Sequence, residues 1–190
     1  ITGLFFNQGQ VCCAGSRLFL EESIHEEFMT KLKERVAKMR QGDGSDEKTH
    51  IGPQVSKEQQ ERVLNYIEIA KGEGATVACG GQSPADMKKG FFVQPTVLTG
   101  VNNTMRIAQE EVFGPVLAVI PFKSMDEVAE QANATTFGLS GAVWTRDIKK
   151  AHKFASLIKA GTIWVNCYNV FDPAVPFGGY KMSGYGRELG

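Results

Sequence analysis

The alternation of short apolar runs with helical stretches after Pro115 constrains the fold more than any other feature of the sequence. The order is an apolar run at 116–122, a helix from Ser124 to about Ala134, a second run at 139–145, a helix over 147–160 closed by Gly161, and a third run at 162–166. Continuous apolar strands separated by helices are typical of parallel strands covered on both faces, because such strands cannot alternate polar residues. We therefore expect an α/β fold with an open, twisted, mainly parallel sheet and helices on both faces.

The first half of the chain carries similar helix and strand signals. Apolar residues recur every three or four positions from Ile24 to Met39, which predicts a helix over about 24–40. A second helix is expected over about 57–71. The apolar, partly β-branched run that follows it, ATVAC at 75–79, suits a buried strand.

Capping and loop signals divide these elements. A serine followed three residues later by Glu or Gln predicts a helix start at Ser23, Ser56 and Ser124. The polar, glycine-containing stretches 41–50 and 80–90 are expected to be surface loops.

Length and composition limit the class of protein. The chain has 190 residues, which at a typical domain size of roughly 150 residues predicts a single domain, 1–190. Its 21 Lys and Arg residues balance 21 Asp and Glu residues, which argues against nucleic acid as the main partner. No apolar run is long enough to span a membrane and the start lacks a signal-peptide pattern, so we expect no membrane partner.

The cysteines and histidines indicate a reduced protein without a metal site. Cys12, Cys13, Cys79 and Cys167 form no CxxC pair and no disulfide framework, which predicts a cytoplasmic chain with free thiols. The three histidines are scattered through the sequence and offer no local ligand spacing for zinc.

The segment FFNQGQVCCAGSR, residues 5–17, is the first candidate site. Gly9 and Gly15 permit close backbone approach, and backbone N–H groups near Cys12 can point at the oxyanion formed when a thiolate attacks a carbonyl. The alternative is that Cys12 and Cys13 are small buried hydrophobic residues in a core turn.

Two further segments have structural and functional interpretations. Glu110 and Glu111, before a Gly-Pro turn, are either a solvated helix end or part of a site. Phe171 and Phe177 are either loop aromatics that plug a core or the wall of a pocket. Lys181, in the glycine-rich PFGGYKMSG, is expected to be a surface or packing residue.

Three motifs in this order, FNQGQVCCAGSR, EEVFGPV at 110–116 and PFGGYKMSGYGRELG at 176–190, resemble the NAD(P)-dependent aldehyde dehydrogenase superfamily. The resemblance covers essentially the whole chain. Cys12, five residues after Asn7, matches the catalytic nucleophile of that family, and Cys13 takes the neighbouring substrate-binding position. In these enzymes the thiolate adds to the aldehyde, hydride passes to the nicotinamide, and water hydrolyses the thioester to the acid.

The same resemblance implies coenzyme and substrate contacts. Glu111 matches the glutamate that hydrogen-bonds the ribose next to the nicotinamide of NAD or NADP, and Phe113 matches the ring that packs near that ribose. Phe171 and Phe177 match the wall that contacts the carbon chain of a small-molecule aldehyde. The resemblance also implies that the parent protein is a homo-oligomer.

The resemblance begins inside the catalytic domain of the family. No G-x-G-x-x-G follows a strand, and the dinucleotide-binding domain, the general-base glutamate and the oligomerisation strands are expected outside residues 1–190. We therefore expect the isolated chain to be nearly inactive, and a packing domain without catalysis is one alternative. A cysteine-dependent esterase or hydrolase that pairs Cys12 with a histidine is another.

Overall fold

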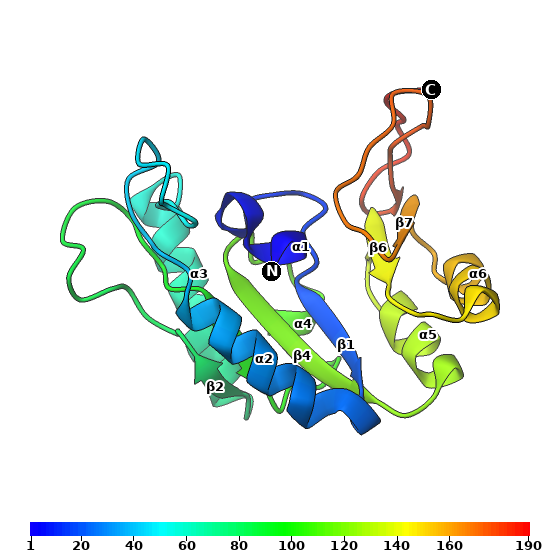
Figure 1. Cartoon of the computed structure of the whole chain (residues 1–190), viewed down its shortest axis with the longest axis horizontal. Helices are drawn as coiled ribbons and strands as arrows, with labels where there is room; N and C mark the ends of the chain where they lie inside the picture. The colour runs from blue at the N-terminus through cyan, green and yellow to red at the C-terminus, as the bar shows by residue number, and fades with distance from the viewer. The chain divides into compact units, whose positions relative to one another are not determined.

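The computed structural model describes all 190 residues, which form two compact units, Ile1–Pro121 and Phe122–Gly190 (Figure 1). The elements that begin in the first unit are α1 (Thr2–Phe5), the 3₁₀ helix η1 (Phe6–Gly9), β1 (Arg17–Glu21), the 3₁₀ helix η2 (Glu22–Ile24), α2 (His25–Ala37), α3 (Lys57–Gly72), β2 (Thr76–Cys79), β3 (Thr96–Thr99), α4 (Arg106–Gln109) and β4 (Val116–Phe122). Those of the second unit are α5 (Met125–Asn133), β5 (Phe137–Gly138), β6 (Ser140–Val143), α6 (Ile148–Leu157), β7 (Thr162–Val165) and β8 (Tyr180–Lys181).

The first unit is built on a four-stranded sheet in the order β1-β4-β3-β2. Strands β3 and β4 are parallel, whereas β2 is antiparallel to β3. Because alternate side chains of a strand point to opposite faces, Leu98 and Ala118 pack with the buried face of α3, and Val97 and Leu117 pack with that of α2. The sheet thus lies between α2 and α3 (Figure 1), and the predicted α/β class with helices on both faces is confirmed.

The second unit has two small sheets of its own. Strands β6 and β7 pair in parallel over four residues, from Ser140 opposite Thr162 to Val143 opposite Val165, and α6 connects them. Strands β5 and β8 form an antiparallel pair. The expected order after Pro115 is confirmed, but β4 pairs with β3 and β1 and not with β6, so these strands belong to two sheets.

Two of the three predicted helix starts are confirmed. Ser56 accepts a hydrogen bond from the Gln59 N–H and begins α3, and Ser124 accepts one from the Glu127 N–H and begins α5. The prediction at Ser23 is wrong, because this serine lies within η2 and α2 starts two residues later, at His25, without a side-chain cap. No helix of the structure is both long and apolar enough to cross a membrane.

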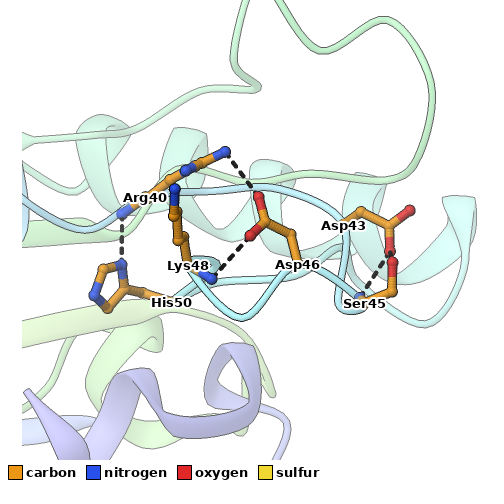
Figure 2. A network of polar contacts seen from close by, with 6 residues as sticks. All are labelled: Arg40, Asp43, Ser45, Asp46, Lys48 and His50. Carbon is orange, nitrogen blue, oxygen red and sulfur yellow. Dashed lines mark hydrogen bonds and ion pairs between the residues drawn. The ribbon is translucent and has the colours of Figure 1, made fainter.

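The loop at 41–50 is closed by a network of polar contacts (Figure 2). The Arg40 N–H donates to His50 Nδ1 at 3.1 Å, and the Arg40 guanidinium pairs with Asp46 at 2.8 Å. Within the loop, Asp43 accepts from both the backbone N–H and the hydroxyl of Ser45. These contacts fix the path of the chain from α2 to residues 52–55, which lead into α3.

Candidate active site

Cys12 lies in a tight turn between η1 and β1. The Ala14 N–H donates to the Val11 carbonyl at 2.9 Å, which closes the turn around Cys12 and Cys13. The Cys12 side chain is exposed, and its backbone N–H donates to no other backbone group. The turn therefore presents a thiol and a free N–H donor together, as stabilisation of an oxyanion on a cysteine adduct requires.

Cys13 has a different environment from its neighbour. Its side chain is only 4% exposed, and burial, with a smaller effect from Cys12, raises the pKa of the Cys13 thiol to about 11. Such a thiol remains protonated at neutral pH and is a poor nucleophile, because the thiolate is the reactive form. The buried-hydrophobe interpretation thus applies to Cys13 and is wrong for the exposed Cys12. Contact between Cys13 and a substrate stays a prediction.

The backbone before the turn brings it against a second motif. Asn7, Gln8 and Gly9 have positive φ angles of 48°, 57° and 73°. A β-carbon on Gly9 would lie 2.2 Å from the Gly114 carbonyl oxygen, so the two backbones are in direct contact. The cysteine segment and the Glu110–Pro115 motif, far apart in sequence, therefore meet within the first unit.

The two adjacent glutamates of that motif have separate roles. Glu110 accepts from Nε and Nη2 of Arg106, at 2.6 and 2.9 Å, and from the Tyr66 hydroxyl at 2.8 Å. These hydrogen bonds, that of Arg106 first, lower the pKa of Glu110 to about 2. The Glu111 carboxylate is exposed and has no hydrogen-bond or ion-pair partner in the chain, so it is the glutamate that a ligand can use.

Side chains of α3 hold the backbone on which Glu111 lies. The Arg62 guanidinium donates to the Glu111 carbonyl at 2.8 Å, and Gln59 Nε2 donates to the carbonyls of Val112 and Phe113 at 3.0 and 2.9 Å. Three consecutive carbonyls thus accept from one helix face. They stabilise the left-handed conformation of Phe113, whose φ is 57° and whose ring is 37% exposed. The sequence marks Gln59 only as part of the predicted helix start at Ser56, and it gives no sign of the contacts that Gln59 and Arg62 make with this backbone.

The second unit contains the two phenylalanines expected at the substrate. Phe171 and Phe177 pack edge to face with centroids 5.1 Å apart, and Phe171 packs against Trp164 at 5.5 Å. The Trp164 indole N–H also donates to the Val170 carbonyl at 2.7 Å, which ties the loop to β7. Phe171 is 47% exposed and Phe177 is half-buried, so the cluster is an aromatic surface and not a sealed plug.

The glycine-rich motif near the end of the chain is held by two cationic side chains. Lys181 Nζ donates to the carbonyls of Asn133 and Thr135 at 2.8 and 3.0 Å. Arg187 donates to the Gly179 carbonyl at 2.8 Å and lies over the Tyr180 ring. Lys181 is therefore a packing residue, as the sequence predicted.

The histidines lack the arrangement of a cysteine hydrolase. His50 Nδ1 accepts the Arg40 N–H, and His25 Nδ1 lies 3.0 Å from Glu26, so both rings have local partners. His152 lies on the exposed side of α6 in the second unit. No group of three or more His, Cys, Asp or Glu side chains is placed to hold a metal ion.

Comparisons with known proteins agree on one family. The model of the aldehyde dehydrogenase family matches residues 1–190. A putative aldehyde dehydrogenase, DhaS, of Bacillus subtilis is 52% identical over 190 residues, which are 100% of this chain and 38% of the relative. Among solved structures, the NAD+ complex of an aldehyde dehydrogenase from Bacillus cereus matches with a TM-score of 0.96 and 51% identity, over 100% of this chain and 38% of that one.

A second solved relative is a betaine aldehyde dehydrogenase mutant from Staphylococcus aureus in complex with NAD+, in which a cysteine is BME-modified. It is 46% identical, with a TM-score of 0.95, and the match covers 99% of this chain and 38% of that one. The chain thus spans little more than a third of the length of the relatives it matches. It belongs to the aldehyde dehydrogenase family.

Proposed function

We propose that the protein containing this chain oxidises an aldehyde to a carboxylic acid with NAD or NADP, and that Cys12 is its nucleophile. The observation that carries the proposal is the contact of Gly9 with Gly114, which sets the exposed Cys12 turn beside the segment bearing Glu111. Because the chain belongs to the aldehyde dehydrogenase family, this contact supports the proposal that the Cys12 sulfur and the Glu111 carboxylate serve one site.

The chemistry assigned to Cys12 follows from the need for a covalent adduct. An aldehyde has no leaving group, so addition of the thiolate creates a tetrahedral alkoxide whose collapse expels hydride and leaves a thioester. The free backbone N–H of Cys12 would donate to the alkoxide and to the oxyanion formed when water attacks the thioester. Hydrolysis then releases the acid and restores the thiol.

The residues of the first unit fit a nicotinamide coenzyme. The exposed, unpaired Glu111 carboxylate accepts hydrogen bonds only, as two ribose hydroxyls require, and the exposed edge of Phe113 supplies an apolar contact. When bound, the coenzyme supplies the acceptor for hydride. The chain contributes the anchoring of Glu111 through Arg62 and Gln59, which fixes where a ribose can lie.

The remaining assignments concern substrate, assembly and compartment. Phe171 and Phe177 would provide an apolar wall for the carbon chain of the aldehyde, with Cys13 beside the reacting sulfur. Family membership supports a homo-oligomeric protein. The four free cysteines support a reducing, cytoplasmic location.

A chimera tests the function directly. In it, this chain replaces the matching 38% of the Bacillus subtilis relative, to which it is 52% identical. We expect the chimera to reduce NAD or NADP when given acetaldehyde or benzaldehyde, measured as the rise in absorbance at 340 nm. The 190-residue chain alone, which spans 38% of that relative, should be at least about 10²-fold slower, because the resemblance implies that the dinucleotide-binding domain and the general-base glutamate are not among these residues. A folded chimera without aldehyde-dependent turnover would contradict the proposal.

Replacing Glu111 by glutamine tests the coenzyme site. The amide keeps the shape of the side chain but loses the charge and one acceptor, and a hydrogen bond to a charged group contributes roughly 1.5–3 kcal/mol. We expect Glu111→Gln to raise the coenzyme KM of the chimera about tenfold or more. Glu110→Gln is the matched control: it weakens the contacts with Arg106 and Tyr66, because the charge and one acceptor are lost, and should lower the melting temperature while leaving that KM within about twofold. The reverse pattern would exchange the two roles.

A further inference from the structure

The segment that leads into α3 contacts the backbone just before the Cys12 turn. The Val55 N–H donates to Gln10 Oε1 at 3.0 Å. Val55 is itself fixed on both sides, since the Gln54 N–H donates to the Phe91 carbonyl at 2.9 Å and Ser56 caps α3. The Gln10 side chain is therefore attached to a rigid helix start that lies more than forty residues away in sequence.

The backbone N–H and carbonyl of Gln10 are also hydrogen-bonded within the first unit. Its N–H donates to the Asn7 carbonyl at 3.0 Å, and its carbonyl accepts from Asn7 Nδ2 at 3.1 Å. With the contact to Val55, the backbone and the side chain of Gln10 are both held. Gln10 thus ends the left-handed run of residues 7–9 at a defined position, two residues before the sulfur.

The turn is held on its other side as well. The Gly15 N–H donates to the Gly3 carbonyl at 2.7 Å, and Cys13 is buried. Only Val11 and Cys12 lie between these downstream contacts and Gln10. Cys12 is exposed, so surrounding side chains do not enclose its sulfur, and the backbone held at the two ends of the turn sets where that sulfur lies.

We propose that Gln10 is a positioning residue for the Cys12 nucleophile, acting through the hydrogen bond from the Val55 N–H. The proposal rests on the function assigned above to Cys12, but the bond itself can be tested without it. Gln10 touches neither substrate nor coenzyme in this role. It connects the turn to the residue just before the Ser56 cap of α3, and α3 also holds the backbone at Glu111, so the start of this helix sets the position of the Cys12 turn relative to the Glu111 backbone.

Hydrogen exchange of the 190-residue chain, resolved to single amides, tests the bond. In Gln10→Met, which keeps the length of the side chain but has no oxygen, we expect the Val55 N–H to exchange about tenfold faster. The Ala14 N–H, which closes the Cys12 turn, should exchange several-fold faster because the turn loses its upstream anchor. Gln10→Glu retains an acceptor and should return both amides to within about twofold of the original rates.

Gln60→Met is the matched control. Gln60 lies in the same unit and also uses its side-chain amide to hold a distant segment, but here the amide N–H donates, to the Phe92 carbonyl at 2.8 Å and to the Ser83 hydroxyl. It should leave the exchange of the Val55 and Ala14 amides unchanged. An unchanged Ala14 amide in Gln10→Met, or the same acceleration in Gln60→Met, would overturn the positioning role.

The chimera links the bond to chemistry. Gln10→Met should lower kcat about tenfold while the coenzyme KM stays within about twofold, and Gln10→Glu should recover most of the loss. A wild-type kcat in Gln10→Met would overturn the inference even if its amides exchange faster. A wild-type chimera without aldehyde oxidation would refute the proposed function instead, and the exchange experiment would still decide whether Gln10 holds the turn.

Discussion

Cys12→Ala is expected to lower kcat for aldehyde oxidation by roughly 10⁴-fold or more in the chimera, because no other group can form the covalent adduct from which hydride leaves. The structure offers no substitute at this position. The adjacent Cys13 is 4% exposed, and the pKa of its thiol is raised to about 11. His50 and His25 contact the Arg40 N–H and Glu26, and neither is paired with a cysteine. The measurement is reduction of NAD or NADP at saturating aldehyde, with the coenzyme affinity determined separately to show that the site is otherwise intact.

The control is the neighbouring thiol. Cys13→Ala removes a buried sulfur and leaves a small cavity, which should cost about 1 kcal/mol of stability and keep kcat within about tenfold. Labelling with iodoacetamide should modify Cys12 and spare Cys13 in the unsubstituted chain, since only the former is exposed. If Cys12→Ala retained activity and Cys13→Ala lost it, the nucleophile would be Cys13 and our proposal would be wrong.

The fold could be predicted from the sequence wherever a local pattern matched a burial pattern. The apolar run at 116–122 forms β4, in which Val116–Ile120 are buried, and the serines at 56 and 124 cap helices because their side chains reach the N–H three residues on. Ser23 shows the limit of such patterns. The same spacing occurs there, but Ser23 lies in the 3₁₀ helix that precedes α2, and its hydroxyl donates to the Glu21 carboxylate and does not cap the helix. The pairing of β4 with β3, and not with β6, was also beyond local information.

The candidate site could be predicted only in part for a related reason. Motifs indicated Cys12 and Glu111, but a motif does not show which of two adjacent side chains is exposed and without a partner in the chain. Burial separates Cys12 from Cys13, and the Arg106 ion pair separates Glu110 from Glu111. The positioning contacts of Gln10, Gln59 and Arg62 connect side chains to backbone groups more than forty residues away. Such long-range polar contacts leave no periodicity in the sequence.

Gly9→Ala should have the largest effect on stability among the substitutions in the first unit that we consider. The added β-carbon would lie 2.2 Å from the Gly114 carbonyl oxygen and 2.4 Å from its carbon, and these are backbone atoms that cannot rotate away. The φ of 73° adds a conformational cost of roughly 1–2 kcal/mol for a residue with a side chain. We expect a total loss of at least about 3 kcal/mol in the free energy of unfolding, measured by urea denaturation with circular dichroism. In the chimera, kcat should fall together with stability, because the turn must move away from the Glu111 segment.

Gly74→Ala separates the clash from the backbone strain. Gly74 lies in the same unit and also has a positive φ, 103°, but a β-carbon there meets nothing within 4 Å. Its substitution should therefore cost only the conformational part, about 1–2 kcal/mol, and leave kcat of the chimera unchanged. If the two variants lose equal stability, the contact of Gly9 with Gly114 does not hold the two motifs together. The site would then need another source of rigidity between the thiol and the carboxylate, since Gln10 fixes only one end of the turn.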